Sequence, residues 1–307
     1  MTGEKGENGN IPGRKTYEEI SNQAAAWSDT INLIDARRKD FADLVSGSEQ
    51  VVFSGCGSAY NASFAIAPWF QAMTGIPSRA VHASEFFLFN RMFFDPKRKC
   101  TAVVLSRSGA TTETVTAMRT AAELGCRTLA VTCFDDSPMS READQALVLE
   151  GASEKSVATT RSLTSMVLAG NYLAARVAGD EKPAESYREL PAIASSKMPA
   201  FDALAARISR IPAIRKFAFV GSGTYYGLAR EAQLKVKETT LLPADAYVSL
   251  DYQHGPMSNV DEHMLVTILS SDAGHQYDQV LAHNMKALGG RVLVLTDSRV
   301  EDFIDCS

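Results

Sequence analysis

The chain has 307 residues, of which 45% are hydrophobic, and it carries a formal net charge of −5. A chain of this length can form about two domains, each with its own core. The negative charge argues against a nucleic-acid surface, for which a basic stripe is expected. We therefore expect a soluble globular protein whose partners are small metabolites.

The cysteines and the N-terminal residues indicate a cytoplasmic protein. The cysteines are Cys56, Cys100, Cys126, Cys133 and Cys306. They include no C-x-x-C pair and their number is odd, which predicts free thiols in a reducing compartment and no metal site. Residues 1–16 lack the apolar stretch of a signal peptide, and no run of the sequence is long enough to span a membrane. We expect this segment to be a disordered tail.

Strands and helices alternate in the first half of the chain. Apolar residues at helical spacing between residues 17 and 46 predict an N-terminal helical segment. The strands expected after it are 51–54, 79–82, 102–106, 128–133 and 146–149, and the helices are 58–73, 112–124 and 160–177. The strands are continuous Val and Leu runs, which is typical of strands buried on both faces. This pattern predicts a parallel sheet between two layers of helices.

The same pattern returns in the second half, after a polar linker around residues 179–183 and a helix. The segment Phe219-Val-Gly-Ser-Gly is similar to Phe53-Ser-Gly-Cys-Gly. Two further segments match earlier ones at a shared offset of 164 positions, namely Leu269 with Leu105 and Leu288 with Leu124. This self-similarity predicts an internal duplication.

We therefore expect two tandem three-layer α/β/α sandwiches with parallel sheets. The first takes in residues 17–180 and the second residues 181–307. The second copy has no counterpart of the strand at 146–149 or of the helix at 160–177. We expect it to be incomplete at its C-terminus.

A hydroxyl-rich loop that follows a strand and opens a helix is the clearest candidate for a ligand site. Unpaired backbone N–H groups at a helix N-terminus attract anions, and the hydroxyls of Ser106, Ser108 and Thr111 can complete a cradle for phosphate. Arg107 adds a positive charge. The same residues also suit an ordinary strand-to-helix turn with Thr111 or Thr112 as the N-cap.

Neither common nucleotide motif fits this chain. The loop lacks the Gly-Lys-Ser/Thr ending of a P-loop, and the earlier Gly-Cys-Gly segment lacks the third glycine of a dinucleotide motif. The second copy has Asp272 and Ala273 where the first has Ser108 and Gly109, and a carboxylate competes with phosphate for the same amides. We expect a small phosphorylated ligand in the first half and none in the second.

Two candidate acid–base groups lie in the second half. Glu231, Lys235 and Glu238 are spaced i, i+4 and i+7 along one face of an expected helix at 226–239. Lys235 can pair with Glu231, whereas Glu238 lies near the helix C-terminus, where the dipole disfavours its charge and suits it to general-base work. A solvated charged face is the alternative. His254 lies in a Gly-Pro turn that can aim its ring into a cleft, although loop histidines are often polar surface.

Six ordered motifs between residues 17 and 298 resemble the SIS (sugar isomerase) domains. They are Gly55-Cys-Gly-Ser-Ala-Tyr-Asn, Ala83-Ser-Glu-Phe, Ser106-Arg-Ser-Gly-Ala-Thr, Glu154 with Val157-Ala-Thr-Thr, Ala229-Arg-Glu-Ala-Gln-Leu-Lys-Val-Lys-Glu and His254-Gly-Pro. The tandem is similar to the isomerase portion of glucosamine-6-phosphate synthase and, more closely, to AgaS-type amino-sugar-phosphate deaminase/isomerases. Arg107 stands where the synthase has a glutamine, which points away from that enzyme.

This resemblance implies roles for particular residues. The phosphate is held by Ser106, Arg107, Ser108 and Thr111, with Ser58 beside it, and the sugar is lined by Val157, Ala158 and Thr159. Glu238 moves a proton between C1 and C2, and His254 helps to open the pyranose ring. The resemblance implies neither a metal nor a cofactor, and each site is completed by a second subunit of a homodimer or larger homo-oligomer.

The activity implied by the resemblance is conversion of galactosamine 6-phosphate to tagatose 6-phosphate with release of ammonia. A plain aldose–ketose isomerase, a fructosamine-phosphate deglycase and a sugar-phosphate sensor that binds without reacting are the alternatives. A sensor needs the loop at Ser106 but has no use for Glu238 together with His254. The sugar epimer depends on one hydroxyl contact that the sequence does not specify.

Overall fold

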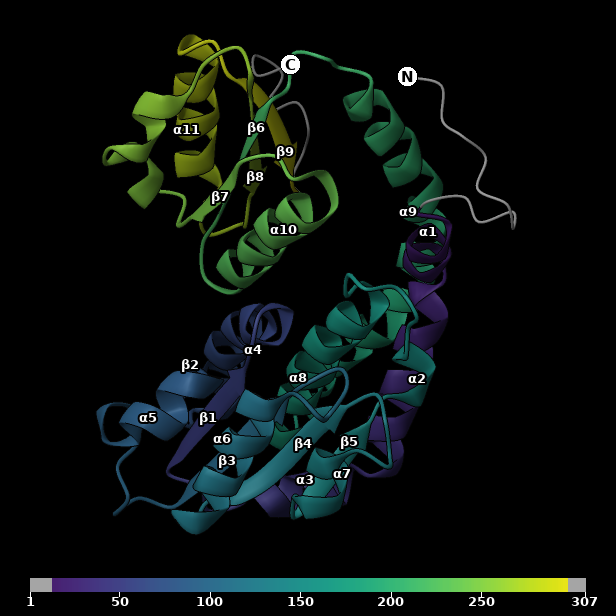
Figure 1. Cartoon of the computed structure of the whole chain (residues 1–307), viewed down its shortest axis with the longest axis vertical. Coiled ribbons are helices and arrows are strands. Elements are labelled where there is room, and N and C mark those ends of the chain that lie inside the picture. The colour runs from purple at the N-terminus through teal and green to yellow at the C-terminus, as the bar shows by residue number, and fades with distance from the viewer. Residues whose placement is uncertain (1–12, 298–307) are drawn as a thin grey trace.

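The computed structural model describes residues 13–297 and contains two parallel β-sheets, one in each half of the chain (Figure 1). The first sheet consists of β1 (Gln50–Gly55), β2 (Ser78–His82), β3 (Cys100–Leu105), β4 (Arg127–Thr132) and β5 (Gln145–Val148), and the second of β6 (Lys216–Gly221), β7 (Ala244–Tyr247), β8 (Met264–Leu269) and β9 (Arg291–Leu295). Their orders are β2-β1-β3-β4-β5 and β7-β6-β8-β9. The predicted α/β class with parallel sheets is confirmed.

Helices cover both sheets. The first half contains α1 (Arg14–Ser21), α2 (Gln23–Ala36), α3 (Arg38–Val45), α4 (Ser58–Thr74), α5 (Ala83–Phe93), α6 (Thr112–Glu123), α7 (Pro138–Glu142), the 3₁₀ turn η1 (Glu150–Ala152) and α8 (Arg161–Ala178). The second half contains α9 (Glu181–Ser209), α10 (Thr224–Thr240), η2 (Asp251–Gln253), η3 (Pro256–Asn259) and α11 (His275–Ala287). Because α1 begins at Arg14, the expectation of a tail through residue 16 is wrong at its last residues. Residues 1–12 lie outside the described part.

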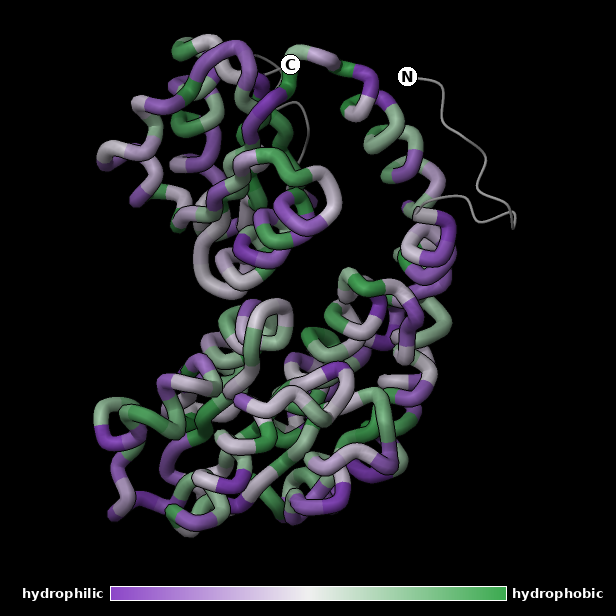
Figure 2. Tube along the Cα trace, viewed as in Figure 1, coloured by the Kyte–Doolittle hydropathy of each residue, from purple (hydrophilic) through white to green (hydrophobic). Residues whose placement is uncertain are grey.

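The first sheet lies between two layers of helices. Along β1, Val51 and Phe53 face the core that α4 and α8 share with the sheet, whereas Val52 faces the core under α5 and α6. Successive strand residues point to opposite faces, so a run of apolar residues fills both cores. Figure 2 shows hydrophobic stretches of the trace inside each half, along the strands and the helices around them.

The second sheet is covered by α10 on one face and α11 on the other. Val266 and Ile268 of β8 pack with Leu281 and Met285 of α11. The long helix α9 runs along one side of the molecule and joins the two halves (Figure 1). The C-terminal incompleteness that we expect concerns positions beyond Leu295, and residues 298–307 lie outside the described part.

Helix α4 of the first half packs directly against α10 of the second. Gly227 lies so close to α4 that a Cβ there would be 2.4 Å from the backbone nitrogen of Ala65. Arg230 lies over the Phe64 ring, 4.7 Å from its centroid, and donates a hydrogen bond to Asn61 Oδ1 at 3.1 Å. The helices run in opposite directions, so the later turns of α10 lie beside the first turn of α4.

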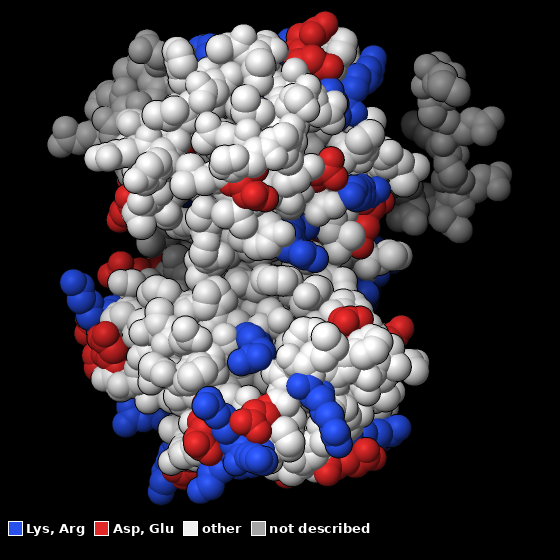
Figure 3. Space-filling view, turned by 90° about the vertical axis from the view of Figure 1, so that its left-hand side faces the viewer, with Lys and Arg blue, Asp and Glu red and all other residues white. Residues whose placement is uncertain are grey.

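The structure shows where the charged side chains and the cysteines lie and whether a helix could cross a membrane. Acidic and basic side chains are interspersed over both halves on the face seen in Figure 3. The cysteines at positions 56, 100, 126 and 133 are free thiols, as predicted, and Cys306 lies outside the described residues. Within residues 13–297, no helix combines the length and apolar character needed to cross a membrane.

Candidate active site

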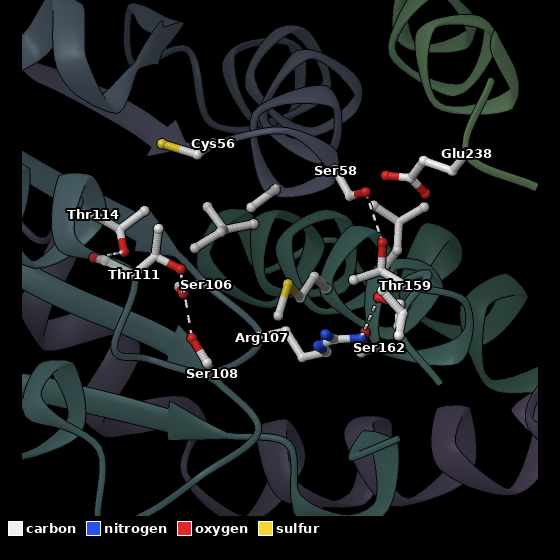
Figure 4. Close-up of a pocket in the computed structure, with 15 residues that line it drawn as sticks. Cys56, Ser58, Ser106, Arg107, Ser108, Thr111, Thr114, Thr159, Ser162 and Glu238 are labelled. Atoms are coloured by element: carbon white, nitrogen blue, oxygen red, sulfur yellow. Dashed lines mark hydrogen bonds between the residues drawn. The ribbon is translucent and has the colours of Figure 1, made fainter. Parts of the chain in front are cut away.

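A pocket of about 180 Å³ opens at the carboxyl ends of β1 and β3 (Figure 4). In the sheet β1 lies between β2 and β3, so the direction in which strands are added reverses at β1. Open α/β sheets bind ligands at such switch points. The walls come from the β1–α4 turn, the β3–α6 loop, the start of α8 with the segment before it, and α10. The wall residues are Cys56, Ser58, Ala59, Leu105, Ser106, Arg107, Ser108, Thr111, Thr114, Val157, Thr159, Ser162, Leu163, Met166 and Glu238.

The structure brings together most of the residues that the sequence singled out. Figure 4 shows Ser106, Ser108 and Thr111 on one side of the pocket and Ser58, Thr159 and Glu238 on the other. Arg107 and Val157 also belong to the walls. Ala158 and His254 do not, and the roles of all these residues stay predictions.

The β1–α4 turn places Ser58 at the first position of α4. Gly57 has φ 53° and ψ −124°, a conformation that side-chain-bearing residues avoid. Gly55 is required for a different reason, because a Cβ there would lie 2.7 Å from the backbone carbon of Ala59. The two glycines allow the chain to turn sharply out of the sheet, so the Ser58 hydroxyl faces the pocket.

The β3–α6 loop turns its hydroxyls toward one another. Thr111 Oγ1 lies 3.2 Å from Ser106 Oγ and 3.4 Å from Ser108 Oγ. Thr111 is the N-cap residue of α6, yet its side chain does not cap the helix. Because the cap hydroxyl faces the pocket, the loop is better suited to hold an anion than to serve only as a capped turn.

Arg107 connects the β3–α6 loop to the segment that precedes α8. Its Nη1 donates to the carbonyl oxygens of Ser156 at 3.0 Å and Val157 at 3.3 Å, and lies 3.5 Å from Glu154 Oε1. The Glu154 side chain is fully buried. The charge of Arg107 is therefore within the wall of the pocket, while its hydrogen bonds go to the neighbouring segment.

The segment 153–160 forms the wall of the pocket opposite the β3–α6 loop. Glu154 accepts hydrogen bonds from Thr160, at 2.9 Å from the backbone N–H and 2.6 Å from the hydroxyl, and from the hydroxyl of Ser162. Thr159 Oγ1 donates to Ser58 Oγ at 2.6 Å. Val157 is 95% exposed at this wall, so an apolar side chain is available for contact with a ligand.

Lys235 lies at the centre of a polar cluster that joins the two halves. Its Nζ is 2.5 Å from Glu238 Oε2 and 3.2 Å from Glu231 Oε1. It also donates to Ser58 Oγ at 3.2 Å and to Thr159 Oγ1 at 3.1 Å. The expected ion pair of Lys235 with Glu231 is present. The ion pair with Glu238 is an additional finding. Lys235 is not among the site residues named from the sequence. Its position i−3 from Glu238 is the signal that could have indicated it.

Glu231 is a buried member of this cluster, only 5% exposed. Burial raises its pKa, and the neighbouring Lys235 ammonium and the hydrogen bond from Asn61 Nδ2 at 3.0 Å offset part of the rise. A solvated charged face is therefore the wrong interpretation at this position. Glu238, in contrast, has 39% of its side chain exposed and faces the pocket.

His254 does not reach this pocket. It follows η2 in an exposed loop of the second half, and it is not among the wall residues. Within a single chain its ring is not part of this pocket, and the prediction that it is aimed into a cleft stays a prediction. Gly255, which follows it, has φ 116°, so the tight Gly-Pro turn itself is present.

The comparisons with known proteins agree with this architecture. The family model of the SIS domain matches residues 44–176 and 213–302. The chain belongs to the SIS domain family. The isomerizing glutamine–fructose-6-phosphate aminotransferase of Rhizobium meliloti is 29% identical over 314 residues, which are 96% of this chain and 50% of that protein. The chain thus spans about half the length of the curated relatives it matches.

Two solved structures are similar over most of their length. Glucosamine-6-phosphate deaminase from Thermotoga maritima superposes with a TM-score of 0.79 at 27% identity, covering 92% of this chain and 85% of that one. The C-terminal domain of glucosamine-fructose-6-phosphate aminotransferase from Francisella tularensis gives a TM-score of 0.83 at 25% identity, covering 97% and 87%.

Proposed function

We propose that the pocket converts an amino-sugar 6-phosphate to the corresponding ketose 6-phosphate with release of ammonia. The observation that carries this proposal is the placement of the Glu238 carboxylate, held by Lys235, opposite a hydroxyl-rich loop in one pocket. A site that only held a sugar phosphate would need the hydroxyls but not the carboxylate. The similarity to the deaminase of Thermotoga maritima supports the same activity.

The loop around Ser106 is the proposed phosphate site. The hydroxyls of Ser106, Ser108 and Thr111 lie at the N-terminus of α6, where no side chain caps the helix. The partial positive charge of the helix end and the nearby Arg107 favour a dianion there. Ser58, Val157, Ala158 and Thr159 are the proposed contacts of the sugar end.

Glu238 is the proposed base. In an open-chain 2-amino aldose, removal of the C2 proton gives an enolamine, and return of the proton to C1 gives an imine at C2. Water then hydrolyses the imine to the ketone and ammonia. One carboxylate that reaches both carbons can perform both proton transfers, and the 2.5 Å contact with Lys235 Nζ fixes the position of that carboxylate.

His254 is the proposed acid–base group for ring opening, and this role requires a second copy of the chain. The histidine is exposed and lies outside the pocket walls of its own chain. A second subunit must therefore present its His254 to this pocket, so we propose a homodimer or larger homo-oligomer as the active form. Light scattering combined with an activity assay tests this, and a fully active monomer contradicts it.

The proposal leaves two substrates to distinguish. The AgaS-type resemblance favours galactosamine 6-phosphate, with tagatose 6-phosphate as the product. The relative from Thermotoga maritima is named for glucosamine 6-phosphate, which differs from the first only in the configuration at C4. The discrimination therefore depends on a contact to one hydroxyl group.

The deciding experiment measures ammonia and ketose 6-phosphate formed from each amino-sugar 6-phosphate, with Glu238→Gln as the inactive control. Both products from the wild-type chain, and neither from the variant, support the proposal. Isomerisation of an aldose 6-phosphate without ammonia identifies a plain isomerase, and turnover of a fructosamine phosphate identifies a deglycase. Tight binding without any product identifies a sensor and overturns the enzymatic proposal.

A further inference from the structure

Glu19 of α1 binds the segment 153–160, which forms one wall of the pocket, although the two lie far apart in the sequence. Its Oε1 accepts the backbone N–H of Lys155 at 2.5 Å, and its Oε2 accepts that of Ser156 at 3.1 Å. The side chain is 7% exposed although it belongs to a short helix near the N-terminus. One carboxylate therefore holds two successive amides of the segment 153–160, and Glu19 itself is not a wall residue of the pocket.

Glu19 and Arg107 together hold the backbone of the segment 153–160. Arg107 holds the carbonyl oxygens of Ser156 and Val157 from the phosphate loop. Ser156 thus has its N–H bound by Glu19 and its carbonyl oxygen bound by Arg107. The next residues include the two pocket-wall residues of this segment, Val157 and Thr159, so the peptide at Ser156 determines where that wall lies.

The hydrogen bonds are strong enough to lower the pKa of Glu19, although burial acts in the opposite direction. A carboxylate that accepts two backbone N–H groups is charge-assisted and more stable than a neutral acceptor in the same place. A glutamine has the same shape but only one accepting oxygen. Its NH₂ group would face the second N–H donor, and one bond would be replaced by a donor–donor contact.

We infer that Glu19 is a positioning residue for the sugar-binding wall of the pocket, acting through the backbone of Lys155 and Ser156. The N-terminal helix α1 is then part of the functional site, although none of its residues touches the pocket. This inference rests on the proposed function for its effect on substrate. The anchoring itself can be measured without any substrate.

The test compares Glu19→Gln with Glu18→Gln. Glu18 is its exposed neighbour on α1 and pairs only with Arg14 in the hydrogen bonds and ion pairs described, so it is a matched control. In Glu19→Gln the segment 153–160 samples other positions, and only the fraction in the competent position binds. We expect KM for the amino-sugar phosphate to rise about tenfold with kcat nearly unchanged, and no change in Glu18→Gln.

Two further measurements separate the inference from the proposed function. The affinity for inorganic phosphate, which needs only the loop around Ser106, should be the same in both variants. Amide hydrogen exchange at Lys155 and Ser156 should be faster in Glu19→Gln than in the wild type. Unchanged exchange overturns the inference, as does a KM that stays within twofold in a chain that turns over the substrate. If the wild type neither binds nor converts phosphosugars, the proposed function fails, and faster exchange would still establish the anchoring.

Discussion

The loops after β3 and β8 occupy equivalent places in the two sheets but differ in charge. The first loop, at Ser106 to Thr111, presents hydroxyls to a pocket that also contains Arg107. The second is followed by Asp278 in the first turn of α11, and the pocket beside it has no Lys or Arg among its described wall residues. Burial raises the pKa of Asp278, and the nearby hydroxyls of Ser270 and Ser249 offset part of that rise. These differences are the reason why the proposed phosphate site lies in the first half and not in the second.

The turns before α4 and α10 are, in contrast, almost the same. Gly57 has φ 53° and ψ −124°, and Gly223 has φ 59° and ψ −128°. Gly221 also matches Gly55, because a Cβ at Gly221 would lie 2.9 Å from the backbone carbon of Tyr225. The backbone of the two halves is therefore alike at the turns where a strand leads into a helix. The two halves differ in the side chains that these turns and helices carry. The first half offers the hydroxyl cradle, and the second offers Lys235 and Glu238.

The largest expected effect comes from removing Glu238, the proposed base that the second half supplies. Glu238→Gln should lower kcat by about 10² to 10⁴, or about 3 to 5 kcal/mol of barrier, because the amide cannot accept the proton. The phosphosugar affinity should survive, since the cradle lies in the first half. Steady-state kinetics, calorimetric binding and deuterium incorporation from solvent at C1 measure these quantities. An active variant that still incorporates deuterium would exclude Glu238 as the base.

A second variant places in the first loop the carboxylate that the second loop has at the equivalent position, Asp272. Ser108→Asp places a carboxylate at the N-terminus of α6, where it competes with phosphate for the helix end. We expect phosphosugar binding to weaken by about 3 kcal/mol, on the order of 100-fold, whereas Ser108→Ala removes one hydroxyl and should cost about 1 kcal/mol. Calorimetric titration of both variants measures the difference. Equal affinities would show that charge does not distinguish the two loops.

A third comparison uses the equivalent turns. Gly57→Ala and Gly223→Ala each force a side chain into a conformation that costs about 1 to 3 kcal/mol of stability, and neither Cβ would meet another atom within 4 Å. Urea unfolding should therefore show similar losses of stability. Only Gly57→Ala should also weaken phosphosugar binding, because Ser58 follows it. Similar weakening in both variants would refute a role confined to the first turn.

Much of this architecture is predictable from the sequence because the strands are buried on both faces. A continuous run of Val and Leu is typical of a strand that is covered by helices on both faces. Each predicted strand of the first half is present, with bounds that differ by at most about two residues. Helix α5 was missed, since its Phe- and Leu-rich stretch has no clear helical period. It contains a kink at Phe89, with φ −131°, and leaves Leu88, Phe89 and Met92 exposed.

From the residues alone, the phosphate loop was predictable because its residues are local in sequence, whereas Ser58, Val157 and Thr159 were named through the resemblance to SIS domains. The loop at Ser106 contains its own hydroxyls and helix start, so the pattern is complete within one segment. The positions of Lys235 and Glu19 depend on packing between distant segments. Lys235 meets Ser58, which lies 177 positions away, only because α10 packs against α4. Such contacts leave no pattern in a single sequence.

The smallest expected effect concerns the buried carboxylate beside the proposed base. Because burial raises the pKa of Glu231 above its ordinary value of 4.5, the folded state binds its proton more tightly than the unfolded state does. Glu231 therefore stabilises the fold fully below pH 4.5, and this contribution is lost as the pH rises through the raised native pKa. Glu231→Gln keeps an acceptor for Asn61 but cannot titrate, so at pH 7 we expect it to change the free energy of unfolding by about 1 kcal/mol or less.

The informative quantity is the pH dependence of the difference in unfolding free energy between the wild type and Glu231→Gln. The stability of the wild type relative to the variant should fall steadily from pH 4.5 upward, whereas a carboxylate with a lowered pKa would give the opposite slope. Urea unfolding of both proteins between pH 4.5 and 8 measures it. Glu189→Gln, on the solvent-exposed side of α9, serves as the control for the same exchange of residue type outside the polar cluster. A flat difference for Glu231→Gln would mean that Lys235 compensates the buried charge completely, and that the polar cluster between the two halves carries no cost in stability.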